Sequence, residues 1–398
     1  MLKKRGAPKQ YTGFFAKHRL AIATATLMGT IIGAGVLAIP YVVAKSGFLL
    51  GLLMILFIGG AFVLLNLSTG EIVLRTKGQH QLTGYVGKYL GPWGKKLMTL
   101  SMSLGIYGAL TAYLIGEGQV LKALFGGPSI IYSLLFFALV AVIVYRGVKA
   151  TGKAELIIIC LLFVVVFLIG IFSFRQINPA NFTTFNPAHF FLPYGVILFA
   201  FVGTAAIPEL QEELENEKKK MKTALIVGSL IPIVLYIIFT VVVIGLVGLD
   251  NFELLQPNER IATVALSAYA HPLLGFLANI FAAFSMLTTF LALGTALTEM
   301  YAYDYRLNRK LAFALVMVVP LIIALSGLAT FIAILGFIGA VVGGLDGILI
   351  VLALWKAKKK GDRKPEYSMK YSHAYGALLV MLFVFGILYK IISSLVLV

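Results

Sequence analysis

Backbone groups, more than charged side chains, are the first candidates for chemistry in this sequence. Residues 29–40 hold three glycines and a proline, and they lie within residues 20–44, which contain no charged residue. Glycine weakens a helix and proline removes a backbone donor, so a helix through this segment is expected to break. The amides that begin its second half attract a carboxylate through unpaired donors and the helix dipole. We therefore predict a carboxylate site at Gly33, Ala34 and Gly35.

A second segment of the same kind follows later in the chain. Residues 199–209 again contain Gly-Thr and Ala-Ile-Pro, inside another apolar run. Carbonyl groups freed near 199–202 would accept hydrogen bonds from an ammonium group, so the two breaks together suit a zwitterionic solute. We expect the site also to include Thr30, Phe199, Gly203 and Thr204. The alternative is that these small residues only let helices pack closely.

The elements that position these segments are membrane-spanning helices. Apolar residues make up 60% of the 398-residue chain and charged residues 12%, against roughly half and a quarter in soluble domains. Uncharged runs near the ~20 residues needed to cross a bilayer recur along the whole chain. They predict an all-α membrane protein with eleven spans, at about 21–43, 48–70, 97–121, 129–145, 154–174, 190–210, 223–248, 273–298, 311–327, 329–354 and 374–394.

The distribution of charge sets the expected orientation. The net charge is +17, which by itself would suggest a nucleic-acid partner. With eleven spans and the N-terminus in the cytoplasm, however, 28 of the 33 lysines and arginines fall in cytoplasmic segments. This asymmetry is typical of membrane proteins. We therefore expect a multi-pass protein of the cell membrane, surrounded by the lipid bilayer, with a cytoplasmic N-terminus, an external C-terminus and no nucleic-acid partner.

The two interrupted spans, which we expect to be discontinuous near 29–35 and 200–206, occupy matching places in two halves. The second interrupted span is the fifth span after the first, so the two run in opposite directions, as an inverted repeat requires. Transporters with such repeats bind solute where the interrupted helices meet. The predicted organisation is a cytoplasmic tail at 1–20, a first repeat at 21–174, a second repeat at 190–355, and an additional span at 374–394.

Four segments carry a resemblance to a known family. Residues 29–40, 107–116, 199–209 and 287–294 resemble signatures of the aromatic and hydroxy amino acid permeases and of the amino acid/auxin permeases, within the amino acid-polyamine-organocation superfamily. The resemblance covers spans 1 to 10 in order and spacing. It implies the leucine-transporter-type five-plus-five inverted repeat with an eleventh helix. It also implies import of an amino acid by symport with Na⁺ or H⁺ through alternating access, with no organic cofactor.

The resemblance also implies particular residues. Tyr113 matches a tyrosine of span 3 that reaches the substrate carboxylate. Sodium in related transporters is held by carbonyl and hydroxyl oxygens of spans 1 and 8, and the matching groups belong to Met28, Ile31, Ser285, Thr288 and Thr289. The alternative is that the two threonines only bond back to their own helix. Residues 156–174 lack the lysine that replaces sodium in some proton-coupled relatives. This favours sodium and leaves a proton route through Glu117, Glu209 or Asp346 open. Asp346 is either a functional buried acid or lies low enough in span 10 to meet cytoplasmic water or a basic partner.

Other classes of protein fit the sequence less well. A channel would need a continuous polar lining and a filter, and neither is apparent. None of the five histidines has a carboxylate or nucleophile placed nearby within a span, so we predict no enzymatic activity. A nutrient sensor on the same fold and a proton-coupled exporter or exchanger stay as alternatives. No obligate protein partner is evident from the sequence.

Overall fold

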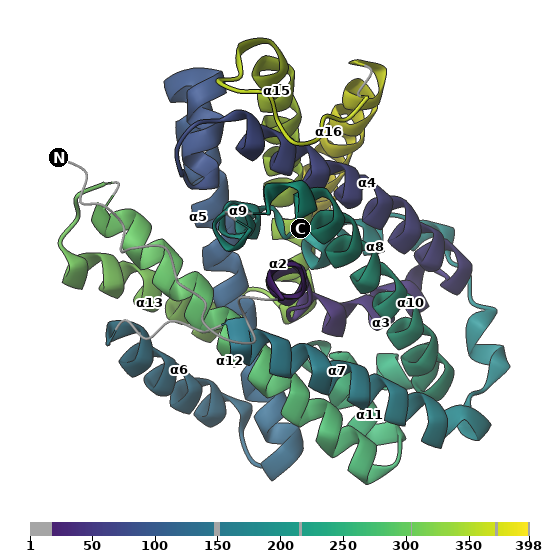
Figure 1. Ribbon diagram of the computed structural model, residues 1–398. Coiled ribbons are helices and arrows are strands. Elements are labelled where there is room, and N and C mark those ends of the chain that lie inside the picture. Colours follow the sequence, from purple (N-terminus) through teal and green to yellow (C-terminus); the bar gives the residue numbers. More distant parts are fainter. Residues whose placement is uncertain (1–17, 147–151, 215–216, 304, 371–372, 397–398) are drawn as a thin grey trace.

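The protein is a bundle of helices. The computed structural model describes residues 18–146, 152–214, 217–303, 305–370 and 373–396, so most of the predicted tail at 1–20 lies outside the described residues. Within these ranges the regular structure is helical, and a single bridge between Gly47 and Phe185 is the nearest approach to strand pairing. The helix α2 lies at the centre of the bundle in one view, and α13 and α16 lie at its rim (Figure 1).

The helices follow the predicted spans in order. Span 1 is split into α2 and α3, span 6 into α8, η4 and α9, and span 10 into α14, η7 and α15. The α-helices are α2 (Arg19–Ile31), α3 (Gly35–Ser46), α4 (Phe48–Arg75), α5 (Leu82–Phe125), α6 (Ser129–Tyr145), α7 (Gly152–Ser173), α8 (Leu192–Phe201), α9 (Ile207–Glu213), α10 (Met221–Leu254), α11 (Ala262–Tyr269), α12 (Pro272–Tyr303), α13 (Arg309–Leu325), α14 (Phe331–Ile338), α15 (Gly344–Lys360) and α16 (His373–Val396). The 3₁₀ turns are η1 (Phe174–Gln176), η2 (Pro179–Phe182), η3 (Pro187–His189), η4 (Thr204–Ala206), η5 (Lys218–Lys220) and η6 (Pro257–Glu259), and η7 (Gly339–Gly343) is a π-helix.

Most of these helices are long and apolar enough to cross a membrane. Seven spans in the described ranges pass that test alone, and the bent pair α2 and α3 forms an eighth. The three other predicted spans correspond to α6, α7 and α13, which have 17, 22 and 17 residues. The chain is therefore a multi-pass membrane protein, as its composition predicts.

Both predicted interruptions are present. The helix α2 ends at Ile31 and α3 begins at Gly35, with a bend of 52° between them. The helix α8 ends at Phe201, before the turn η4. The two breaks are shorter than the predicted 29–35 and 200–206. Both spans are confirmed as discontinuous. They also pack together, because a Cβ atom added at Gly35 would lie only 2.7 Å from the Cα of Ala200.

Span 10 contains a third interruption that was not predicted. Its π-helix lies directly against α8, since a Cβ atom on Gly339 would be 1.9 Å from the carbonyl oxygen of Gly195. Only glycine permits such close approach of two backbones. The helix α8 therefore contacts α3 through Gly35 and span 10 through Gly339, which fixes the half-helix that leads into the second break.

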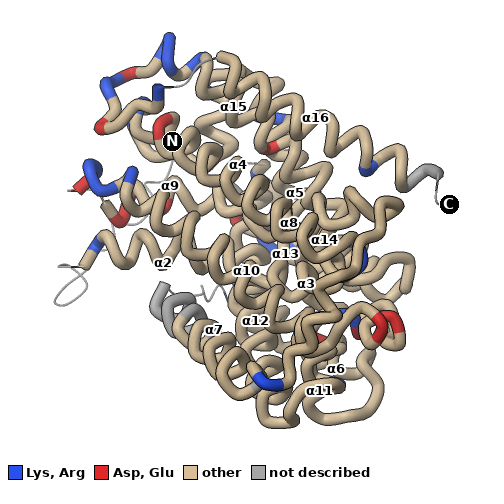
Figure 2. Tube along the Cα trace, turned by 90° about the vertical axis from the view of Figure 1, so that its right-hand side faces the viewer, with Lys and Arg blue, Asp and Glu red and all other residues tan. Residues whose placement is uncertain are grey.

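Charged residues gather mainly at the two ends of the bundle (Figure 2). We name the end where α2 begins and α9 and α15 end the basic end. The helix α16 finishes on the far side from the start of α2, as an odd number of spans requires. The central region is largely free of charge, apart from isolated residues such as Asp346, whose side chain is buried in span 10.

Candidate functional site

Three residues from three different spans meet at the first break. A Cβ atom on Gly33 would lie 3.7 Å from the hydroxyl of Tyr113 on α5 and 3.7 Å from the hydroxyl of Thr289 on α12. Tyr113 is 2% exposed, and its hydroxyl bonds to no residue in the described ranges. The structure thus brings together a glycine and two hydroxyl groups that the sequence placed 80 and more residues apart.

The backbone amides at this break differ from the prediction in one respect. The amide of Gly33 is not free, because it donates to the carbonyl of Ile31 at 2.9 Å. The amides of Ala34 and Gly35 have no acceptor in the part of the chain that the structure describes. The carbonyl of Ile31 can accept a hydrogen bond from the Gly33 amide because the chain turns sharply where α2 ends. Two amides, rather than three, are therefore available to a carboxylate.

The second break faces the first across an apolar contact. A Cβ atom on Gly203 would lie 2.5 Å from Cγ1 of Ile31, so glycine is needed there for close packing. Thr204 is buried beside it, and Phe199 is half-buried on α8. Thr30 is half-buried and its hydroxyl donates to the carbonyl of Thr26, within its own helix. These four predicted residues surround the breaks, but among the described residues they form no hydrogen bonds from one break to the other.

A tyrosine that the sequence did not single out joins the two breaks. The hydroxyl of Tyr236, on α10, lies 2.8 Å from the carbonyl oxygen of Ile31 and 2.9 Å from that of Ala200. One hydroxyl hydrogen is therefore shared between carbonyls at the ends of α2 and α8. Tyr236 is fully buried, and its ring packs on Phe201 with the centroids 5.1 Å apart. Among 18 tyrosines it carries no distinguishing sequence signal.

Replacing Tyr236 by phenylalanine is expected to loosen both breaks. The ring and its contact with Phe201 would remain. The carbonyl of Ala200 would lose its hydroxyl donor and that of Ile31 would keep only the Gly33 amide, which costs about 1–2 kcal/mol. We expect transport at subsaturating substrate to fall about tenfold, with a lower melting temperature. Tyr194→Phe is the matched control, since its hydroxyl donates to Leu382 on α16, away from the breaks. Equal losses in both variants would contradict a role specific to the breaks.

The predicted sodium ligands are only partly assembled. The hydroxyls of Thr288 and Thr289 donate to the carbonyl of Ser285, at 3.2 and 2.9 Å. The carbonyl of Met28 accepts the amide of Ile32, and the carbonyl of Ile31 accepts the hydroxyl of Tyr236. Of the two threonines, Thr289 is the one that lies beside the break. The two donating hydroxyls and the carbonyl of Met28, which accepts one hydrogen bond, each keep a lone pair for a cation. The carbonyls of Ile31 and Ser285 each accept two hydrogen bonds, so a cation would have to replace one of those donors.

The three acidic residues considered for a proton route differ in their surroundings. Glu209 lies on α9, toward the basic end of the bundle, and is exposed. Glu117 is 4% exposed, and one of its carboxyl oxygens has no partner within the described ranges. Asp346 is 7% exposed, again with one oxygen that has no described partner. Asp346 is therefore a buried group, rather than one that meets water at the end of span 10.

Polar contacts join the two halves of the bundle on both sides of the site. At the basic end, the hydroxyl of Thr26 on α2 donates to Glu213 of α9 at 2.9 Å. At the opposite end, Glu253 on α10 pairs with Lys45 of α3 at 2.9 Å and with Arg260 at 3.0 Å. Residues 31–40 are all buried between these contacts. The breaks thus lie buried between two sets of polar contacts that join the two halves.

Two broken helices whose buried breaks meet at mid-bundle are the arrangement of a secondary transporter. The comparison with known proteins agrees. Residues 16–393 match the tryptophan/tyrosine permease family, and the chain belongs to this family. It is an amino acid permease and not an enzyme. Its fold is similar to that of MhsT, solved in complex with L-phenylalanine, with a TM-score of 0.67, 16% identity, and coverage of 94% of this chain and 98% of MhsT.

Curated relatives cover most of this chain and of their own length. The tyrosine-specific transport system 1 of Haemophilus influenzae is 24% identical over 86% of this chain and 89% of its own. Glutamine transporter 2 of Aliivibrio fischeri is 24% identical over 84% of this chain and 88% of its own. The tryptophan-specific transport protein of Shigella flexneri is 23% identical, with coverage of 92% and 93%. These relatives support the resemblance that the four segments carry.

Proposed function

We propose that this protein imports an amino acid together with a cation, by exposing a binding site at the two breaks alternately to each side of the membrane. The observation that carries this proposal is the meeting of Gly33, Tyr113 and Thr289 at the first break. Two free amides and a tyrosine hydroxyl suit a carboxylate. A carbonyl-rich helix end opposite them suits an ammonium. Neither role needs a charged side chain, which agrees with the uncharged surroundings.

Aromatic amino acids are the proposed substrate class. Two of the relatives are named for tyrosine and tryptophan, and the related fold of MhsT holds phenylalanine. A glutamine transporter of similar identity makes glutamine the principal competitor. The panel to be tested is therefore L-tyrosine, L-tryptophan, L-phenylalanine and L-glutamine.

Sodium is the proposed coupling ion. The candidate ligands are the hydroxyls of Thr288 and Thr289 with the carbonyls of Ser285, Met28 and Ile31. Support comes from oxygen-only chemistry, which suits a hard cation, and from the position of Thr289 beside Gly33. Substrate and ion would then lie next to each other, so that binding of one strengthens binding of the other.

The orientation follows from the charges. We propose that the basic end faces the cytoplasm, because cytoplasmic segments of membrane proteins are enriched in lysine and arginine. The N-terminus is then inside and the C-terminus, after α16, is outside. The contact between Thr26 and Glu213 would open toward the cytoplasm, and the contact between Lys45 and Glu253 would open toward the exterior.

Uptake into proteoliposomes tests the proposal. The expected result is accumulation of one or more of the four labelled amino acids when sodium is imposed outside, and little accumulation without a gradient. Binding without uptake under any gradient would favour a nutrient sensor on the same fold. Faster release than entry, driven by a proton gradient, would favour an exporter or exchanger. Either outcome would overturn the proposed import.

A further inference from the structure

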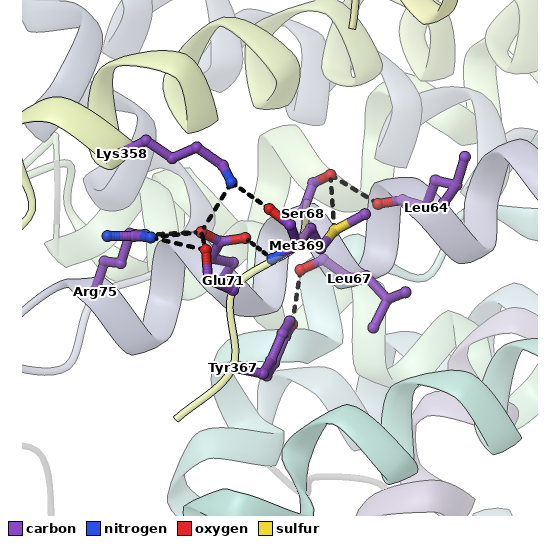
Figure 3. Close-up of polar contacts among 9 residues, drawn as sticks. Leu64, Leu67, Ser68, Glu71, Arg75, Lys358, Tyr367 and Met369 are labelled. Atoms are coloured by element: carbon purple, nitrogen blue, oxygen red, sulfur yellow. Dashed lines mark hydrogen bonds and ion pairs between the residues drawn. The ribbon is translucent and has the colours of Figure 1, made fainter. Parts of the chain in front are cut away.

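The segment between α15 and α16 is fastened to the basic end by a buried carboxylate. We name residues 361–370 the strap. Glu71, near the end of α4, has no solvent exposure and accepts hydrogen bonds from the hydroxyl of Ser368 and the amide of Met369, both at 2.9 Å (Figure 3). Arg75 and Lys358 pair with the same carboxylate at 2.8 and 3.4 Å. A buried charge needs such compensation, so the strap is held in one position.

Two further contacts fix the strap along its length. The hydroxyl of Tyr367 donates to the carbonyl of Leu67 at 2.6 Å. Asp362 accepts the amide of Lys77 at 2.8 Å and pairs with Lys88. The Lys88 ammonium and the Lys77 amide hold the pKa of Asp362 below its ordinary value. The strap therefore lies across the ends of α4 and α5 and is not a loose loop.

The strap and the preceding turn of α15 are strongly basic. Residues 356–370 contain seven lysines and arginines and two acidic residues, a formal charge of +5. Glu71 pairs with Lys358, and Glu366 pairs with Arg363 at 2.6 Å. Five lysines are exposed and form no ion pair within the described ranges: Lys356, Lys359, Lys360, Lys364 and Lys370.

Another segment at the same end contains several lysines but has no excess of positive charge. Residues 209–222 contain four lysines, but they also contain five glutamates, for a formal charge of −1. Lys220 pairs with Glu217 at 3.0 Å. Figure 2 shows both colours close together beyond α9. Lysines at this end therefore do not all carry uncompensated charge, whereas the strap and the end of α15 keep a formal charge of +5.

The position of the strap places its charges at the surface of the bilayer. It joins two membrane spans, α15 and α16, through a short connection. The helix α16 exposes Leu378, Met381 and Phe385 to the surroundings, as expected of a lipid-facing span. Trp355 packs against His373 at the same level, with ring centroids 5.6 Å apart, and aromatic residues favour the membrane interface.

We propose that the strap and the end of α15 form a binding surface for the phosphate headgroups of anionic phospholipids. Clusters of four to eight lysines and arginines next to a span attract such lipids. Here Glu71 keeps the backbone of the cluster in place, so the exposed lysines are arranged before the lipid arrives. The inference goes beyond the proposed transport function, since it needs only membrane insertion, and failure of amino acid uptake would leave it intact.

Lipid retention tests this surface. The full chain is purified from mixed phosphatidylcholine and phosphatidylglycerol vesicles, and native mass spectrometry counts the phosphatidylglycerol that stays bound. We expect replacement of Lys359, Lys360, Lys364 and Lys370 by glutamine to lower retention at least threefold. The matched control replaces Lys218, Lys219, Lys220 and Lys222 by glutamine and is expected to retain the parent amount.

A second variant guards against loss of folding. Arginine at the four strap positions keeps the charge and is expected to retain phosphatidylglycerol as the parent does. Equal loss in the strap and control variants, or no loss in either, would overturn the proposal. So would equal stabilisation of the protein by inorganic phosphate in purely phosphatidylcholine vesicles, because the surface would then be a site for free anions.

Discussion

Leucine in place of Gly33 is expected to abolish transport without unfolding the protein. A side chain there would fill the space that Gly33 leaves beside Tyr113 and Thr289, where even a Cβ atom reaches ordinary contact at 3.7 Å. The carboxylate of a substrate would be displaced from the amides of Ala34 and Gly35. Loss of that interaction is expected to reduce uptake at least about a hundredfold, equivalent to ~3 kcal/mol. Initial uptake rates and melting temperatures of the reconstituted protein measure the two effects separately.

Two further glycines serve as controls for this prediction. Gly60→Leu adds the same side chain on α4, where nothing lies within 4 Å of an added Cβ atom, and should transport normally. Gly35→Ala forces a Cβ atom to 2.7 Å from the Cα of Ala200, so it should lower stability as well as uptake. A stably folded Gly33→Leu protein with normal uptake would refute the carboxylate site at this break.

Valine at Thr288 and Thr289 is expected to weaken sodium dependence. Each change keeps the shape of threonine and removes one oxygen from a site of about five. We expect the sodium concentration for half-maximal uptake to rise about tenfold or more in the double variant, which corresponds to ~1.4 kcal/mol. Amino acid affinity should fall with it, because coupling between two ligands is reciprocal. The measurement is uptake as a function of sodium, with amino acid binding measured in parallel.

Thr298→Val is the control on the same helix. Its hydroxyl donates to the carbonyl of Gly294 at 2.7 Å, so it makes the same kind of bond to its own helix. It should leave sodium dependence unchanged. If a proton gradient alone drives uptake and the double variant behaves like the parent, the two threonines are only helix-bonded. The buried carboxyls of Glu117 and Asp346 would then be the residues to examine for coupling, since Glu209 is exposed.

The class of the protein and the positions of its helix breaks were predictable from the order of its amino acids. Span length, the excess of lysine and arginine on alternate connections, and glycine with proline inside an apolar run are local properties. They act through the cost of placing bare backbone or charge in lipid, which is much the same for any arrangement of the spans. For this reason the discontinuities of spans 1 and 6 were predictable at 29–35 and 200–206, within a few residues of where they lie.

The hydrogen bonds made by the groups at the breaks depend on how the helices pack, and the sequence did not predict them. At the sharp turn after α2, the Gly33 amide donates a hydrogen bond to the carbonyl of Ile31. The position of α10 places the hydroxyl of Tyr236 within hydrogen-bond distance of the carbonyls of Ile31 and Ala200. The π-helix of span 10 and the strap on Glu71 depend likewise on contacts between distant segments. Spacing along a helix specifies which face a side chain occupies, whereas the partner on that face depends on how the helices pack.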